Sequence, residues 1–149
     1  MLALALLAAG CTKNVYEGHG VRWEPPRGVT LQHELDESEG VNLEFSGGVQ
    51  LALLGMKEHG LPETVSDDGL DELAQAVSPS GAKVISKRTG KVPAGAVARF
   101  VWLQGASKTC LYYLPYKDQA LMLSLTAPSA SFGVAESQFD LSMSKLSLQ

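Results

Sequence analysis

Hydrophobic and polar residues alternate along much of the chain, and the alternation predicts strands. In residues 29–37, every second residue falls on the side that we expect to face the core: Val29, Leu31, His33 and Leu35. A period of two with polar residues in between is typical of a half-buried strand. Residues 41–45 repeat the pattern, and the Ser-Glu-Gly turn between the two segments predicts a hairpin. The inward residues of this second segment are Val41, Leu43 and Phe45. Residues 49–58 read as a more buried strand.

The second half of the chain predicts four further extended segments. Residues 83–92 look like a strand with a turn. Residues 94–105 are almost wholly apolar, which indicates a central strand that is covered on both faces. Residues 107–116 and 119–128 read as two more strands, joined by a turn at Tyr116–Gln119.

Two segments have the spacing of helices instead. The first carries apolar residues on one helical face at Leu70, Leu73, Ala74 and Val77. Ser66, Asp67 and Asp68 precede it, and a hydroxyl oxygen and negative charge suit the free N–H groups at a helix N-terminus. The second is a stripe near the end of the chain: Phe132, Ala135, Phe139, Met143 and Leu146. The order of strands, helix, strands, helix predicts an α+β domain with an antiparallel sheet of about six strands, flanked by helices.

Three stretches of this layout resemble the PsbP-like fold, also called the Mog-type fold. They are His19–Leu31 with its Trp-Glu-Pro-Pro-Arg-Gly turn, Val92–Gly105, and Ala120–Leu148 with its spaced aromatic residues. The resemblance implies an α/β/α sandwich and a protein that binds partners or supports the assembly of complexes, without a shared set of catalytic residues. Val29 stands where such domains often carry a tryptophan, and we expect Trp23 to fill that space.

The N-terminus has a pattern of its own. Residues Leu2–Ala9 are all Leu or Ala, which is too short to cross a bilayer but fits the apolar core of a secretory signal. Residues Leu7–Cys11 resemble a bacterial lipoprotein box, although Ala8 stands where Leu is commoner and no Lys or Arg precedes the apolar run. The resemblance implies a signal peptide over residues 1–10, acyl chains on Cys11, a tether over 11–20 and one domain over 21–149. The alternative is an apolar N-terminus with a buried cysteine.

Localisation follows from the same resemblance. Thr12 stands where an aspartate would favour the inner membrane of a double-membraned bacterium. Its absence implies the outer membrane, on the periplasmic face, with the inner membrane as the alternative. The partners that we expect are therefore the membrane, through the lipid on Cys11, and a protein of the envelope.

Composition narrows the function without naming it. The 149 residues are 45% hydrophobic, which is enough for a core, and carry a net charge of −4. Up to Val77 there are thirteen acidic and four basic residues, and after it three acidic and eight basic residues. The basic half is too dilute to indicate binding of nucleic acid.

The residues that could carry chemistry are scattered. Cys110 lies in an apolar stretch and is expected to be a buried structural thiol. None of the three histidines, His19, His33 and His59, has a partner at the spacing of metal ligands. Acidic residues gather at the predicted hairpin tip at Asp36, Glu37, Glu39 and Glu44; they match no calcium loop, and a solvated tip is favoured. We therefore predict no enzyme, no metal and no cofactor.

The candidate partner-binding residues are Tyr112, Tyr113 and Tyr116. Tyrosines are favoured at protein interfaces, although core packing with the hydroxyl at the surface is the commoner role. In a strand, Tyr112 and Tyr113 point to opposite sides. Three functions remain open, in this order: a lipid-anchored module that binds an envelope protein, a module that binds a small ligand or lipid between sheet and helix, and a hydrolase assembled from distant residues.

Overall fold

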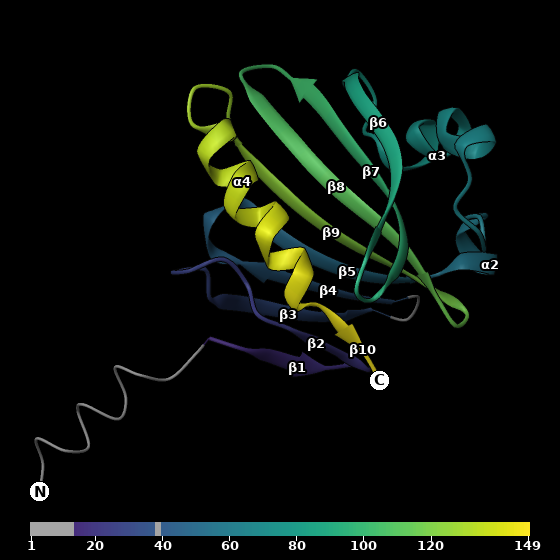
Figure 1. Ribbon diagram of the computed structural model, residues 1–149, viewed down its shortest axis with the longest axis horizontal. Coiled ribbons are helices and arrows are strands. Elements are labelled where there is room, and N and C mark those ends of the chain that lie inside the picture. Colours follow the sequence, from purple (N-terminus) through teal and green to yellow (C-terminus); the bar gives the residue numbers. More distant parts are fainter. Residues whose placement is uncertain (1–13, 38–39) are drawn as a thin grey trace, which may run out of the picture.

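The computed structural model describes residues 14–37 and 40–149 (Figure 1). The expected signal peptide and Cys11 lie outside these ranges. The helical segments are η1 (Ser46–Gly48), α2 (Met56–His59), η2 (Asp67–Gly69), α3 (Leu70–Val77), α4 (Phe132–Ser142) and η3 (Met143–Lys145). The strands are β1 (Tyr16–Gly18), β2 (Val21–Trp23), β3 (Leu31–Glu37), β4 (Gly40–Phe45), β5 (Val49–Gly55), β6 (Lys83–Val92), β7 (Gly95–Gln104), β8 (Ser107–Tyr116), β9 (Gln119–Pro128) and β10 (Ser147–Leu148). Within the described part of the chain, no helix is long and apolar enough to span a membrane.

A seven-stranded antiparallel sheet forms the body of the molecule, so the predicted α+β class is confirmed. Its order is β3-β4-β5-β9-β8-β7-β6. The β3–β4 hairpin and the β6–β7–β8–β9 meander appear where the sequence predicts strands. The central strand differs from the prediction. Residues 94–105 were expected at the centre, but β9 is the central strand and β7 lies next to the edge, because β5 pairs with β9. The expectation that β7 is covered on both faces is confirmed, since all its residues from Val97 to Trp102 are buried.

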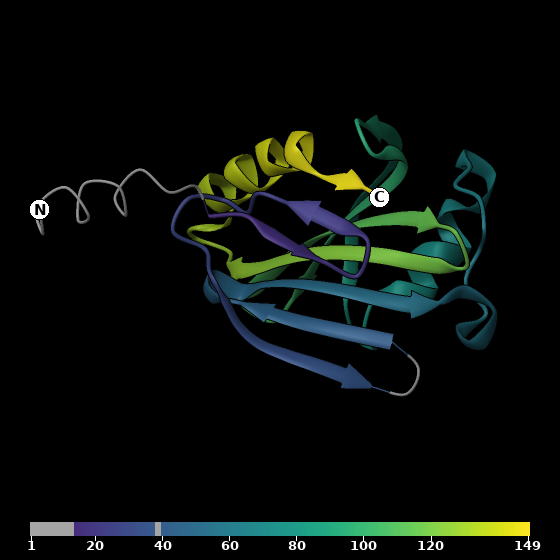
Figure 2. The same cartoon turned by 90° about the horizontal axis from the view of Figure 1, so that it is seen from below.

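A second, three-stranded sheet joins the two ends of the described chain, in the order β1-β2-β10. The sequence assigned residues 11–20 to a tether, yet Tyr16–Gly18 pair with β2 as its first strand. The C-terminal strand β10 pairs with the other edge of β2 and was not expected either. Strands of two or three residues are too short to show a period in the sequence. This small sheet and α4 lie on the same side of the large sheet (Figures 1 and 2).

The first face of the large sheet is covered over the strands from β4 to β7. Alternate residues of β4, β5, β7, β8 and β9 point into one core with Trp23 and with the apolar stripe of the last helix. The predicted stripe is confirmed, because its residues are buried or half-buried: Phe132, Ala135, Phe139, Met143 and Leu146. Trp23 is 0% exposed and makes edge-to-face contacts with Phe45 and Phe139, at ring-centroid distances of 5.5 and 6.4 Å.

The second face is covered over part of its width. The intervening residues of β7 and β8 form a separate core with Met56 and with the buried residues of α3. Ser66 accepts a hydrogen bond from the Gly69 N–H at 3.2 Å, as expected of a capping residue. The helices α2 and α3 lie at one side of the sheet, and none of the helices in the described part of the chain covers this face over β3 and β4 (Figure 1).

The inward pattern predicted for β3 is wrong, because this edge strand is open on both faces. Leu31 pairs with Phe45 on the first face, and Leu35 pairs with Asn42 on the second. Leu31 and Leu35 are 41% and 47% exposed, and His33 is exposed as well. A bulge between Leu31 and His33 shifts the pairing with β4, so that His33 and Leu35 share the uncovered face. An alternating strand pattern shows that a strand has two different faces, but it cannot show that a cover exists for the apolar one.

Candidate functional site

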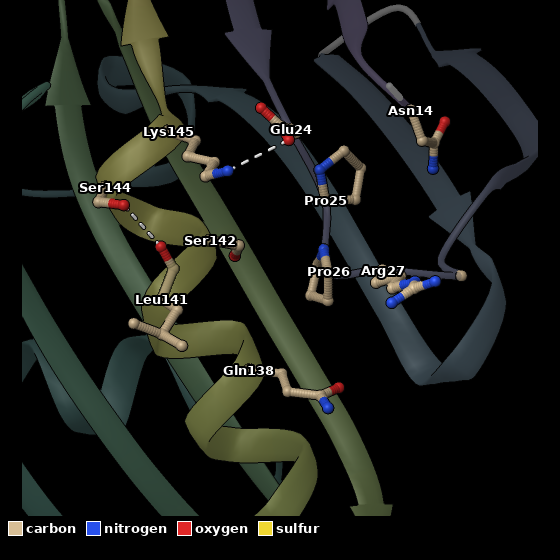
Figure 3. A pocket seen from close by; sticks show the side chains of 11 residues that line it. Asn14, Glu24, Pro25, Pro26, Arg27, Gln138, Leu141, Ser142, Ser144 and Lys145 are labelled. Atoms are coloured by element: carbon tan, nitrogen blue, oxygen red, sulfur yellow. Dashed lines mark hydrogen bonds and ion pairs between the residues drawn. The ribbon is translucent and has the colours of Figure 1, made fainter. Parts of the chain in front are cut away.

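A groove with a volume of about 660 Å³ runs between the segment after β2 and the outer side of α4 (Figure 3). One wall is the Glu24–Gly28 segment with Asn14 beside it, and the other is the C-terminal half of α4 with η3. Pro25, Pro26 and Leu141 supply apolar surface, and charged side chains lie along the rim. The groove therefore combines apolar and charged surface in the way that binding sites for organic ligands do.

Trp23 fixes the two walls relative to each other. Its indole Nε1 donates a hydrogen bond to the Ser142 carbonyl oxygen at 3.2 Å, and Ser142 is the last residue of α4. Because the ring is fully buried between β4 and α4, the residues that follow Trp23 leave the core directly beside the helix. The width of the groove is thus set by core packing.

The wall formed by the Pro-Pro segment is a well-defined turn. The Val29 N–H donates to the Pro26 carbonyl oxygen at 3.0 Å, and Gly28 takes the positive φ of 84° that a glycine tolerates best. The Ser46 hydroxyl accepts from the Thr30 N–H at 3.0 Å, and the Asn14 side-chain amide donates to the Val29 carbonyl oxygen. These bonds hold the start of the described chain against the turn.

The wall formed by α4 is fixed to the sheet by a buried ionic cluster. The Arg99 guanidinium of β7 donates to Glu136 Oε2 at 2.7 Å and to Asp140 Oδ2 at 3.0 Å, both on α4. The Tyr112 hydroxyl of β8 donates to Asp140 Oδ1 at 2.5 Å. Arg99 is buried, with 8% of its side chain exposed, whereas the two carboxylates are 27% and 35% exposed. Guanidinium and carboxylate groups in this geometry form charge-assisted hydrogen bonds that restrict the helix to one position.

The rim of the groove carries both paired and unpaired charge. Lys145 donates to Glu24 Oε1 at 3.2 Å across the groove, and this pair is drawn in Figure 3. Arg27 is exposed and makes no hydrogen bond or ion pair within the described residues. Leu141, on the α4 side, is 72% exposed, as is Val134 two helical turns before it.

The three candidate tyrosines lie elsewhere. Tyr112 and Tyr113 point to opposite faces of the sheet, as predicted, and belong to the two separate cores. Their exposed fractions are 6% and 0%, and the Tyr113 hydroxyl donates to the Pro62 carbonyl oxygen at 2.7 Å. Burial raises the pKa of Tyr113 to about 12. Both tyrosines are core residues in this structure, whereas Tyr116 is half-buried, and a role for it in binding stays a prediction.

The other candidates are also not assembled into a site. Cys110 is fully buried, as expected, and burial raises the pKa of its thiol to about 12. His19 contacts Glu34 at 2.8 Å near the surface, and His33 and His59 are exposed. The predicted acidic tip includes residues 38–39, which lie outside the described ranges. Among the residues that the structure describes, no group of three His, Cys, Asp or Glu side chains could hold a metal.

Sequence reasoning missed the groove and the Arg99 cluster. A signal for the cluster was present: Arg99 is the single charge in a long apolar segment, and Glu136 and Asp140 are four residues apart, which places them on one face of a helix. The Trp-Glu-Pro-Pro-Arg-Gly segment also stood out as a turn. Nothing in the sequence, however, brings this turn and residues 138–145 together.

Comparison with known proteins agrees with the fold. The solution structure of cyanobacterial PsbP (CyanoP) from Synechocystis sp. PCC 6803 matches with a TM-score of 0.56 at 11% identity, over 91% of this chain and 92% of that one. The fold is PsbP-like. A Pseudomonas aeruginosa protein of unknown function matches with a TM-score of 0.49 at 13% identity, over 92% and 97% of the two chains. No family model matches the sequence, and neither does any curated protein.

Proposed function

We propose that this protein is a non-catalytic binding module that is anchored in the bacterial envelope by acyl chains on Cys11. In this proposal it lies at the periplasmic face of the outer membrane and holds a protein partner there. The PsbP-like fold supports a binding role, and the lipoprotein-like residues Leu7–Cys11 support the anchor. Two or more acyl chains are enough for stable attachment to a bilayer.

The observation that carries the proposal is the part of the large sheet that no helix covers. Register places one row of residues across it, from Leu35 through Asn42 and Ala52 to Met122. Leu54 lies on the same face, opposite Ala120. We call these five residues the open sheet patch: Leu35, Asn42, Ala52, Leu54 and Met122. Leu35 is 47% exposed and the others are half-buried. Four of the five residues are apolar, and apolar residues that gather on an uncovered sheet face are typical of surfaces that bind other proteins.

The buried groups support binding over catalysis. The thiol of Cys110 and the hydroxyl of Tyr113 lie in the core, with pKa values raised to about 12, so both keep their protons at neutral pH. The Arg99 guanidinium donates its hydrogen bonds to Glu136, Asp140 and Tyr112. None of the described histidines lines the groove. These groups stabilise the fold and are poorly placed to transfer protons to a substrate.

The anchor is tested by fractionation. Cys11→Ser removes the thiol that carries the lipid, so we expect the protein to move from the membrane fraction to the soluble periplasmic fraction. Mass spectrometry of the native protein should show acyl chains on an N-terminal Cys11. Recovery of Cys11→Ser in the membrane fraction, in the same amount as the native protein, would contradict the anchor.

Partner binding is tested at the open sheet patch with a matched control. Leu35→Glu places a carboxylate in the patch, whereas Ile85→Glu makes the same change on β6 at a residue that is 46% exposed. After crosslinking in intact cells and purification, we expect a crosslinked envelope protein with the wild type and Ile85→Glu, and loss of it with Leu35→Glu. Equal crosslinking of both variants would remove the patch as the binding surface.

A second candidate function is the binding of a small ligand or lipid, and the groove favours it. The space predicted for such a ligand, between sheet and helix, is occupied by the core around Trp23 and Phe139, both 0% exposed. The groove lies instead on the outer side of α4, and its volume falls within the range of small-molecule sites, about 300–1,000 Å³.

A further inference from the structure

We propose that the groove faces the membrane that holds the anchor and binds the phosphate of an anionic phospholipid headgroup. This inference rests on the proposed lipidation of Cys11 and names the ligand of the groove. It also gives the domain an orientation: α4 and the Pro-Pro turn toward the bilayer, and the open sheet patch away from it.

The connection between the anchor and the groove is short. Asn14 lines the groove, and its side-chain amide is bonded to the turn that forms one wall. Cys11 lies three residues earlier in the chain, and three extended residues span at most about 11 Å. Acyl chains on Cys11 would therefore hold Asn14, and the groove with it, within about 11 Å of the point where the chain enters the headgroup layer. The domain cannot turn its opposite side to the membrane without unfolding β1, which begins at Tyr16.

The surface around Asn14 carries both basic and exposed apolar side chains. Arg27 is exposed beside the groove and has no ionic partner within the described residues. Lys145 on the opposite wall is 51% exposed and is paired with Glu24, so the excess positive charge at the groove comes from Arg27. Leu141 and Val134 are both 72% exposed and lie seven residues apart, on one side of α4. Basic side chains next to exposed apolar ones match the interface of a bilayer that contains anionic lipid.

The groove and the open sheet patch lie on opposite sides of the large sheet. The groove lies between α4 and the Pro-Pro turn, in the layer that covers the first face of the large sheet. The open sheet patch lies on the second face. Its Met122 pairs with Tyr113, which belongs to the core of that face, and Leu35 lies in the same row. A membrane at the groove therefore leaves the patch free for a partner in the aqueous compartment.

The experiment measures which side of the lipidated protein touches lipid. Leu141→Cys introduces a thiol at an exposed position, and it is the reactive one, because Cys11 carries lipid and Cys110 is 0% exposed with a raised pKa. A bimane fluorophore on Leu141→Cys is compared with one on Ile85→Cys, at an exposed position on β6. The full-length lipidated proteins are reconstituted in brominated phosphatidylethanolamine vesicles with and without phosphatidylglycerol. We expect several-fold stronger quenching at the Leu141→Cys label, and stronger quenching when phosphatidylglycerol is present.

Two further variants separate orientation from attachment. An insertion of about ten Gly and Ser residues between Lys13 and Asn14, with a mean span of roughly 18 Å, should keep the protein in the membrane fraction and lower quenching at the Leu141→Cys label. Arg27→Gln should abolish the effect of phosphatidylglycerol, whereas Lys91→Gln, at an exposed residue of β6, should leave it unchanged.

The outcomes are distinct for the two proposals. Equal quenching of the two labels, or stronger quenching at the Ile85→Cys label, would overturn the orientation while the membrane fraction still shows the anchor. Quenching at the Leu141→Cys label that does not depend on phosphatidylglycerol would overturn the anionic ligand. A protein that never enters the membrane fraction would overturn the anchor itself, and the inference with it.

Discussion

The two faces of the large sheet are built from alternate residues of the same strands, yet they are used differently. The first face is covered over β4 to β7 by α4 and the small sheet, and it contains the cluster of buried Arg99 with Glu136 and Asp140. The second face is covered by α2 and α3 over β7 and β8, and it leaves Leu35 47% exposed over β3. The first face therefore contributes to the core over most of its strands, whereas the second contributes over β7 and β8 and leaves a wider part exposed.

The contrast teaches that stability and binding are divided between the two faces of this domain. On the first face, Arg99 is paired with Glu136, Asp140 and Tyr112, and these bonds hold α4 in place, which in turn shapes the groove. Leu35, the most exposed residue of the open sheet patch, belongs to neither core. Substitutions that respect this division should separate loss of folding from loss of binding.

The largest expected effect compares two leucines on neighbouring strands. Leu43→Ala on β4 removes a side chain that is 0% exposed in the first core, and we expect it to lower the free energy of unfolding by about 2–5 kcal/mol. Leu35→Ala on β3, at the open sheet patch, should change it by less than about 0.5 kcal/mol. Urea denaturation followed by circular dichroism measures both. A loss of similar size in the two variants would mean that the second face is covered over β3 as well.

A smaller effect is expected from the buried cluster. Arg99→Met keeps an apolar stem in the core but leaves Glu136 and Asp140 without their cation, so we expect a loss of about 1–3 kcal/mol. The loss is moderate because both carboxylates reach water. Lys145→Met removes the more exposed pair with Glu24 and should cost less than about 1 kcal/mol. If the two variants were equally stable in thermal denaturation, the cluster would not be what fixes α4.

The smallest expected effect is a change in the free energy of unfolding with pH. It tests whether water is excluded from the covered part of the second face, as it is from the first. Tyr113 has its pKa raised by burial from 10.0 to about 12. Because the folded state holds this proton more tightly, its contribution to stability is complete below pH 10 and is lost as the pH rises toward 12.

We therefore expect stability to fall across this range, and Tyr113→Phe to reduce that fall. Denaturation curves at several alkaline pH values, with tyrosinate absorbance as a second readout, measure the change. Tyrosinate formation at Tyr113 near pH 10 without unfolding would show that water reaches this part of the second core.

The local elements could be predicted from short-range patterns in the chain. The spacing of Leu70, Leu73 and Ala74 predicted α3, and the stripe from Phe132 to Leu146 predicted which side of the last helix is buried. The almost wholly apolar segment over β7 predicted a strand covered on both faces, and Cys110 was expected in the core. Each of these depends on a periodicity within a few residues, and burial follows a periodicity wherever a neighbouring element supplies cover.

Tertiary structure decided the features that depend on distant segments. The pairing of β5 with β9 placed β9 at the centre, and the short β1 and β10 could pair with β2 because α4 brings the chain back. The groove needs Pro25 and Leu141 side by side, and the cluster needs Arg99 opposite Asp140. Leu35 stayed exposed because no helix reaches it. A local pattern encodes which side of an element is apolar, but only the packing of the whole chain decides what lies against it.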